Sequence, residues 1–152
     1  MRLFRISLCL SLVAVAVSLA SCDPLSSVDY KVFNTTEDTI TVTMFEEILT
    51  SDYHGFAIEE NDSVVSRYGE SDSVNVAVLK PHQVLWVHND WNGLYREDWI
   101  VPLWKFIKTI RVGDTELAPE SWKNEQEWYL KTEGGTRFKG ESRYYTLYIR
   151  NL

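Results

Sequence analysis

The chain has 152 residues, a net charge of −7, 24% charged residues and 13% aromatic residues. This length suits one domain that buries a sizeable core. The acidic balance, with lysines and arginines scattered along the chain, makes nucleic acid and anionic lipid head groups poor partners.

The N-terminal segment is typical of a secretory signal. Arg2 and Arg5 precede residues 6–20, which carry no charge and end in small side chains. This run is too short to cross a bilayer, which needs about 20 apolar residues. Cleavage after the run would remove both arginines and make the net charge more negative by two.

The junction that follows reads Leu19-Ala20-Ser21-Cys22. It resembles the lipobox of bacterial lipoproteins, in which the cysteine thiol takes a diacylglyceryl group, the signal is cut before it and the new amino terminus is acylated. The resemblance implies that residues 1–21 are a signal peptide and that Cys22 is lipidated. A plain signal peptide with a coincidental cysteine is the alternative.

The same resemblance predicts a location. Two or three acyl chains hold a protein firmly on a membrane, whereas one chain holds it marginally. Asp23 resembles the inner-membrane retention signal of one bacterial lineage, but other lineages ignore it, and we expect the outer membrane of a cell envelope. We expect residues 22–28 to form a short tether with a reach of roughly 20 Å, followed by one domain, 29–152.

The two cysteines, Cys9 and Cys22, lie in the signal and at its cleavage site. The domain therefore has no thiol, which excludes disulfides, thiolate metal sites and cysteine nucleophiles. All six tryptophans and eight tyrosines follow the signal and supply material for a core.

Apolar residues alternate with polar ones from Val28 to Phe33 and again from Ile40 to Met44, which predicts a β-hairpin with one buried face. Turn residues separate further runs of the same kind, and residues 121–128 suit a short helical turn. In the last run, alternation places Tyr145, Leu147 and Ile149 on the buried face. The further predicted strands are 74–79, 84–88, 99–101, 107–112, 128–130 and 144–150, with breaks at Pro81, Asn92-Gly93, Pro102, Gly113-Asp114, Pro119 and Gly134-Gly135.

Many short strands with such breaks predict an all-β fold, an antiparallel sandwich of about seven or eight short strands. The stretches YKVFNTTEDTITVTM, VLKPHQVLWV and YYTLYIRNL behind a lipobox are similar to small single-domain bacterial lipoproteins of unknown function. That resemblance implies an immunoglobulin-like sandwich and a location in the cell envelope, and it implies no particular activity.

Residues 84–101 contain Asn92-Gly93, a strong two-residue hairpin signal. If these two residues form the whole loop, Trp86 lies opposite Trp99 and Leu85 lies opposite Ile100.

The aromatic residues of this segment have two interpretations. They could belong to the core, because sandwiches commonly bury a tryptophan. Alternatively, Trp91, Tyr95 and Trp99 could form an exposed platform that stacks on sugar rings or on a protein partner.

The sequence lacks recognisable metal-binding motifs. The loop around Asn92 lacks the first and last acidic ligands of a calcium-binding EF-hand, and His54, His82 and His88 lack metal-site spacing. We therefore predict no metal and no cofactor. The acidic stretches at residues 59–62 and 121–127 suit solvated surface, with a docking site as the alternative.

No catalytic motif supports an enzyme. We expect a non-catalytic binding or scaffolding module, held on a membrane by its lipid, whose partner is an envelope protein or a glycan. The alternatives are a carbohydrate-binding accessory that uses the aromatic residues near Asn92-Gly93, and a hydrolase with an unrecognised pair of carboxylates.

Overall fold

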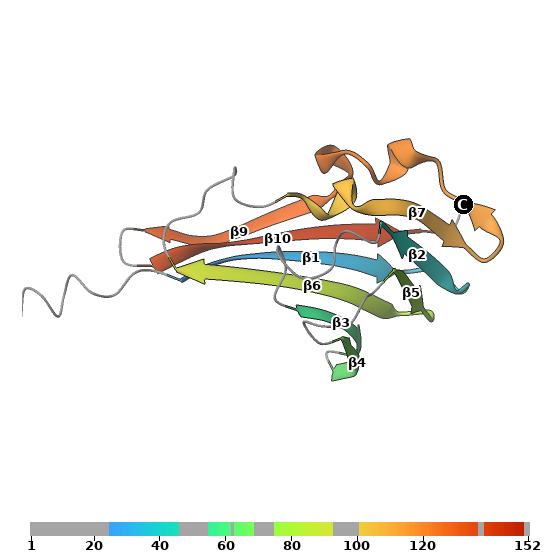
Figure 1. Ribbon diagram of the computed structural model, residues 1–152, viewed down its shortest axis with the longest axis horizontal. Helices are drawn as coiled ribbons and strands as arrows, with labels where there is room; N and C mark the ends of the chain where they lie inside the picture. The colour runs from blue at the N-terminus through green and yellow to red at the C-terminus, as the bar shows by residue number, and fades with distance from the viewer. Residues whose placement is uncertain are drawn as a thin grey trace, which may run out of the picture.

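The computed structural model is a sandwich of two β-sheets (Figure 1). It describes residues 25–45, 55–61, 63–68, 75–92, 101–136 and 139–150. The strands of these residues are β1 (Leu25–Asn34), β2 (Ile40–Met44), β3 (Gly55–Glu60), β4 (Ser63–Tyr68), β5 (Val76–Leu79), β6 (Gln83–Asn92), β7 (Ile107–Val112), β8 (Thr115–Glu116), β9 (Tyr129–Thr136) and β10 (Lys139–Ile149). Three short 3-10 helices are η3 (Leu103–Lys105), η4 (Pro119–Ser121) and η5 (Glu125–Glu127). The predicted all-β sandwich is confirmed.

The larger sheet has the strand order β4-β3-β6-β1-β10-β9, and the smaller sheet has the order β5-β2-β7-β8. β1 pairs with β10 in parallel, and the other ladders are antiparallel. The long strands of the larger sheet follow the long axis of the molecule, and the smaller sheet covers the half toward the ends of β1 and β10 (Figure 1). One face of the larger sheet therefore stays outside the sandwich, and we call it the outer face.

The core between the sheets is apolar and, at its centre, aromatic. Tyr30 of β1 stacks on Tyr145 of β10 with ring centroids 5.1 Å apart, and its ring edge meets Trp104 and Trp128 at 5.7 Å and 5.9 Å. Such ring pairs add about 0.5–1.5 kcal/mol each beyond their buried area. Tyr145, Leu147 and Ile149 are all buried, as the alternation predicted.

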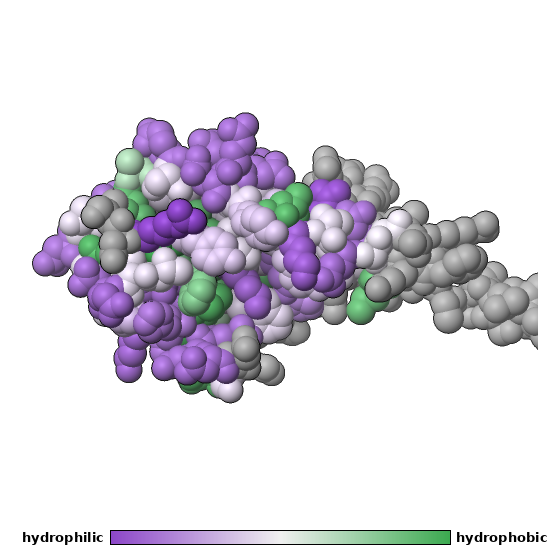
Figure 2. Space-filling view, turned by 180° about the vertical axis from the view of Figure 1, so that it is seen from behind, coloured by the Kyte–Doolittle hydropathy of each residue, from purple (hydrophilic) through white to green (hydrophobic). Residues whose placement is uncertain are grey.

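The surface has little continuous apolar area on the side shown in Figure 2. Hydrophilic side chains border a paler central region, and hydrophobic colour occurs there only in small separate areas (Figure 2). In the part of the chain that is described, no helix has the length and apolar character needed to cross a bilayer.

The predicted hairpin of residues 28–44 is wrong, because β1 belongs to the larger sheet and β2 to the smaller one. The buried side chain of Asn34 holds the crossing segment. Its Nδ2 donates to the carbonyl oxygens of Asp38 and Leu79, and its Oδ1 accepts from the backbone N–H and hydroxyl of Thr36. Each donor and acceptor of the amide is satisfied, so Asn34 can be buried where the chain crosses from one sheet to the other.

The predicted register of residues 84–101 is also wrong. The neighbours of Trp86 across the ladders are Lys31 on β1 and Ala57 on β3. A strand has two hydrogen-bonding edges, and both are occupied at Trp86, which leaves no place opposite it for Trp99. Residues 93–100, including the second half of the predicted hairpin, lie outside the described residues.

Other strand predictions differ in detail. β7 has the predicted bounds, whereas β6, β9 and β10 are longer than predicted, and β3 and β4 were not predicted. Of the acidic stretch at residues 59–62, Glu59 and Glu60 end β3 and Asn61 follows at φ 50°, whereas residue 62 lies outside the described residues. Gly134 and Gly135, predicted as a break, lie inside β9 with φ of 85° and 77°. Residues 121–128 hold η5 and the last residue of η4.

Candidate functional site

The outer face of the larger sheet carries a group of polar and aromatic side chains. In β1, Val28, Tyr30 and Val32 belong to the core, and the strand pleat therefore points Asp29, Lys31 and Phe33 to the outer face. Across the ladders, Asp29 lies beside His88, and Lys31 lies beside Trp86. Together with Glu59 of β3, these four polar and aromatic residues make up the outer-face cluster: Asp29, Lys31, Glu59, Trp86 and His88.

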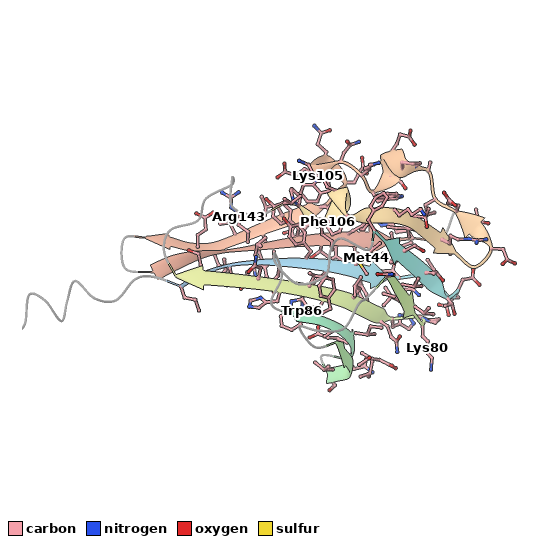
Figure 3. All side chains as sticks on the ribbon, in the orientation of Figure 1. Met44, Lys80, Trp86, Lys105, Phe106 and Arg143 are labelled. Carbon is pink, nitrogen blue, oxygen red and sulfur yellow. The ribbon has the colours of Figure 1, made fainter. Side chains whose placement is uncertain are left out.

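Asp29 is the centre of the cluster. Only 5% of its surface is exposed, although it sits on the face away from the core. Trp86 donates its Nε1–H to Asp29 Oδ1 at 2.6 Å, and His88 Nδ1 lies 2.9 Å from the same oxygen. Trp86, labelled in Figure 3, lies on β6, between β3 and β1. Burial of a carboxylate is costly unless it is hydrogen bonded, and these two ring nitrogens lower that cost.

The shared oxygen has a consequence for the chemistry of the cluster. Trp86 Nε1–H donates to Oδ1, and His88 Nδ1 lies within hydrogen-bond distance of the same oxygen. No described residue donates to the second oxygen of Asp29, Oδ2. The described part of the cluster therefore holds one carboxyl oxygen that is in contact with two ring nitrogens and one that can still accept a hydrogen bond.

Lys31 joins the cluster from the next outward position of β1. Its Nζ lies 6.0 Å from the centroid of the Trp86 ring and 3.7 Å from Glu59 Oε2. The ring of Trp86 is in turn 5.3 Å from that of His88, with an interplanar angle of 31°. A partly exposed ion pair of this kind contributes about 0–1 kcal/mol, so it positions Lys31 more than it stabilises the fold.

Aromatic residues continue the outer face toward β9. Phe33 contacts Tyr148 with ring centroids 5.9 Å apart, and Lys131 Nζ lies 6.0 Å from the centroid of Tyr144. Lys131 also donates to Glu133 at 2.7 Å, and this hydrogen bond, aided by the charge of Glu133, raises the pKa of Lys131 above its ordinary 10.5. The face thus combines aromatic rings with charges of both signs.

The residues predicted as a site from the sequence are only partly placed. The backbone of Trp91 lies in β6 opposite Ser26, and its side chain is not among those described. Tyr95, Trp99 and Cys22, which is the predicted lipidation site, lie outside the described residues. The platform of Trp91, Tyr95 and Trp99 therefore remains a prediction.

The core interpretation of the segment 84–101 is wrong for Trp86, which is half-buried on the outer face. Three tryptophans outside that segment, Trp104, Trp122 and Trp128, are buried in the core. Asp29 and Lys31 were not predicted as site residues from the sequence. Their only local signal is their place at the outward positions of an alternating strand, which solvated residues share.

Metal chemistry finds no support in the described ranges, where no group of three or more His, Cys, Asp and Glu residues could hold an ion. His82 lies in the turn before β6, where its positive φ of 66° belongs to the turn geometry. No protein-family model matches the chain, and no curated protein matches it.

Proposed function

We propose that this chain is a lipid-anchored, non-catalytic binding or scaffolding module of a bacterial cell envelope, held on the outer membrane through Cys22. The resemblance of Leu19 to Cys22 to a lipobox, placed after an uncharged run, supports the anchor. We also propose that the sandwich is of the immunoglobulin-like kind that this resemblance implies.

The start of β1 makes the proposed tether shorter than the sequence indicated. β1 begins at Leu25, so only Asp23 and Pro24 separate it from Cys22. Three residue steps reach about 10 Å. Asp29 then lies about 13 Å further along the strand, at about 3.3 Å per residue. On this proposal the outer-face cluster works close to the membrane surface.

The observation that carries the binding function is the buried carboxylate of Asp29 on the outer face. The core is complete without it, because the apolar residues between the sheets supply the burial. A polar group that is costly to bury and is held by two ring nitrogens, those of Trp86 and His88, is a preorganised binding element. Trp86 and His88 contact this carboxylate directly, and Lys31 lies near the ring of Trp86. Aromatic side chains such as that of Trp86 are enriched in binding sites.

A carbohydrate ligand is the second candidate, and the aromatic character of this face favours it. Rings of Trp86, Phe33 and Tyr148 can stack on sugar rings, and Asp29 Oδ2 can accept a sugar hydroxyl. The glycan site proposed here therefore uses other aromatic residues than those near Asn92-Gly93 that were predicted from the sequence. No observation favours a carboxylate hydrolase over binding.

Retention of envelope material by the immobilised, lipidated protein in detergent micelles tests this function. Trp86→Ala should lower the retained material about tenfold or more, as loss of a central aromatic residue does at binding sites. Phe45→Ala is the matched control, because Phe45 is an exposed aromatic residue that follows β2 of the other sheet. Protease treatment of the extract separates the two candidates, since a protein partner would be lost and a glycan retained. Equal retention by wild type and Trp86→Ala, with unchanged melting temperatures, would refute the outer-face site.

A further inference from the structure

A groove lies at the edge of the larger sheet, lined by residues from the segment before β9, the start of β9 and the end of β10. β9 begins at Tyr129, opposite Thr146, whereas β10 continues to Ile149. The groove has a volume of about 610 Å³, within the range of ligand sites. The residues around it that matter here are Glu127, Trp128, Tyr129, Leu147, Tyr148 and Arg150.

The backbone of Tyr148 points into this groove. The N–H and the hydroxyl of Thr35 both donate to the carbonyl oxygen of Ile149, at 3.0 Å and 2.5 Å, so the hydrogen-bonding groups of Ile149 face the β1 edge. Successive residues of a strand present these groups to opposite edges. Tyr148 therefore directs its N–H and C=O to the other edge, beyond the first residue of β9, where no described residue bonds to them.

The side chains give the groove a floor and walls. Leu147 and Trp128 are buried beneath it, and Trp128 is fixed by the hydrogen bond that its Nε1–H donates to the carbonyl oxygen of Trp122 at 2.8 Å. Tyr148 and Tyr129 are 43% and 62% exposed, and both project on the outer-face side. This arrangement combines open backbone groups with apolar contact area.

Arg150 supplies a charge at the open end. It is exposed, follows the last residue of β10 and has no ion-pair partner among the described residues. It lies two residues after Tyr148, so its side chain is directed to the same side as that of Tyr148. An acidic side chain on a strand added beside β10 would meet it across the ladder.

We propose that this groove binds an extended peptide segment, which adds antiparallel to β10 in line with β9. The peptide backbone pairs with the N–H and C=O of Tyr148, in the manner of β-strand addition to an open sheet edge. An acidic side chain two residues before the pairing residue faces Arg150. This site involves neither the lipid anchor nor the five residues of the outer-face cluster, and it shares only Tyr148 with the aromatic part of the outer face.

Selection from a random heptapeptide library displayed on phage, with the full lipidated protein in detergent micelles as target, tests the proposal. The selected peptides should share an acidic residue at a fixed position. For the best synthetic peptide, N-methylation of the residue that pairs with Tyr148 should weaken binding about tenfold or more, because it removes a backbone donor. Arg150→Glu should weaken binding about tenfold or more, since it reverses the facing charge.

Trp86→Ala is the control and should leave peptide affinity within about twofold, because Trp86 lies outside the groove. A loss of binding in Trp86→Ala would assign the peptide to the outer-face cluster and overturn the groove. Failure to enrich any peptide over empty micelles would also overturn the proposal. So would equal binding of the N-methylated peptide, a result that depends on no change to the protein.

Discussion

Replacing Cys22 by alanine is expected to abolish incorporation of a clickable palmitate and to leave an unprocessed precursor. The thiol is the acceptor of the diacylglyceryl group in the lipoproteins that Leu19 to Cys22 resemble, and cleavage in that family follows lipidation. Gel mobility and fluorescence of the labelled protein in the native host measure both effects.

Cys9→Ala provides the matched control for this experiment. Cys9 lies within the uncharged run of the signal. This variant should be labelled and cleaved like the wild type. Undiminished labelling of Cys22→Ala would contradict the lipobox assignment and return the segment to a plain signal peptide.

Leu147→Ala is expected to lower the free energy of unfolding by about 2–5 kcal/mol, the range for a large-to-small change in a packed core. Leu147 is 3% exposed, on the inward face of β10 beside Val32 of β1. Truncation removes its apolar contacts and leaves a cavity that the two packed sheets cannot fully close. Urea denaturation of the detergent-solubilised protein measures the change.

Leu25→Ala makes the same chemical change at a residue that is 59% exposed. It should alter the free energy of unfolding by no more than about 0.5 kcal/mol, as is usual for surface positions. Equal losses in the two variants would show that Leu147 does not face the core.

Elements governed by local alternation could be predicted from the sequence. The inward set of β10 is the predicted one, because a strand with one buried face has apolar residues at every second position. β7 also has the predicted bounds, although its buried residues Ile107, Ile110 and Val112 depart from strict alternation. Alternation does not identify the partner strand. Val28 to Phe33 and Ile40 to Met44 look like two arms of a hairpin, yet Asn34 binds the carbonyl oxygens of Asp38 and Leu79 and holds a crossing between sheets.

The hairpin around Asn92-Gly93 failed for a related reason. The turn signal predicts a local partner for Trp86, but β1 and β3 occupy both of its edges. These partners lie far away in the sequence, and pairing at long range depends on burial across the whole sheet. A local turn preference of about 1 kcal/mol is small beside that burial.

The outer-face cluster could not be predicted, because three strands distant in the sequence build it. Asp29 occupies an outward position of β1. At such a position a polar residue fits the alternation of apolar and polar residues whether its side chain is exposed or buried. Its burial follows from Trp86 and His88, which reach it only after β6 pairs with β1. The spacing of Asp29, Trp86 and His88 along the chain does not indicate that they contact one another.

Hydroxyl-radical footprinting shows whether a partner occupies the outer-face cluster in the native envelope. The protein is labelled in intact cells and again after purification in detergent, and oxidation is quantified by residue. We expect oxidation of Trp86 and His88 to be at least about twofold lower in cells, because a bound partner shields their rings. Phe45, 44% exposed beyond β2, should be oxidised equally in both samples. Equal oxidation of Trp86 and His88 in cells and in detergent would show that no partner covers the outer-face cluster in the envelope.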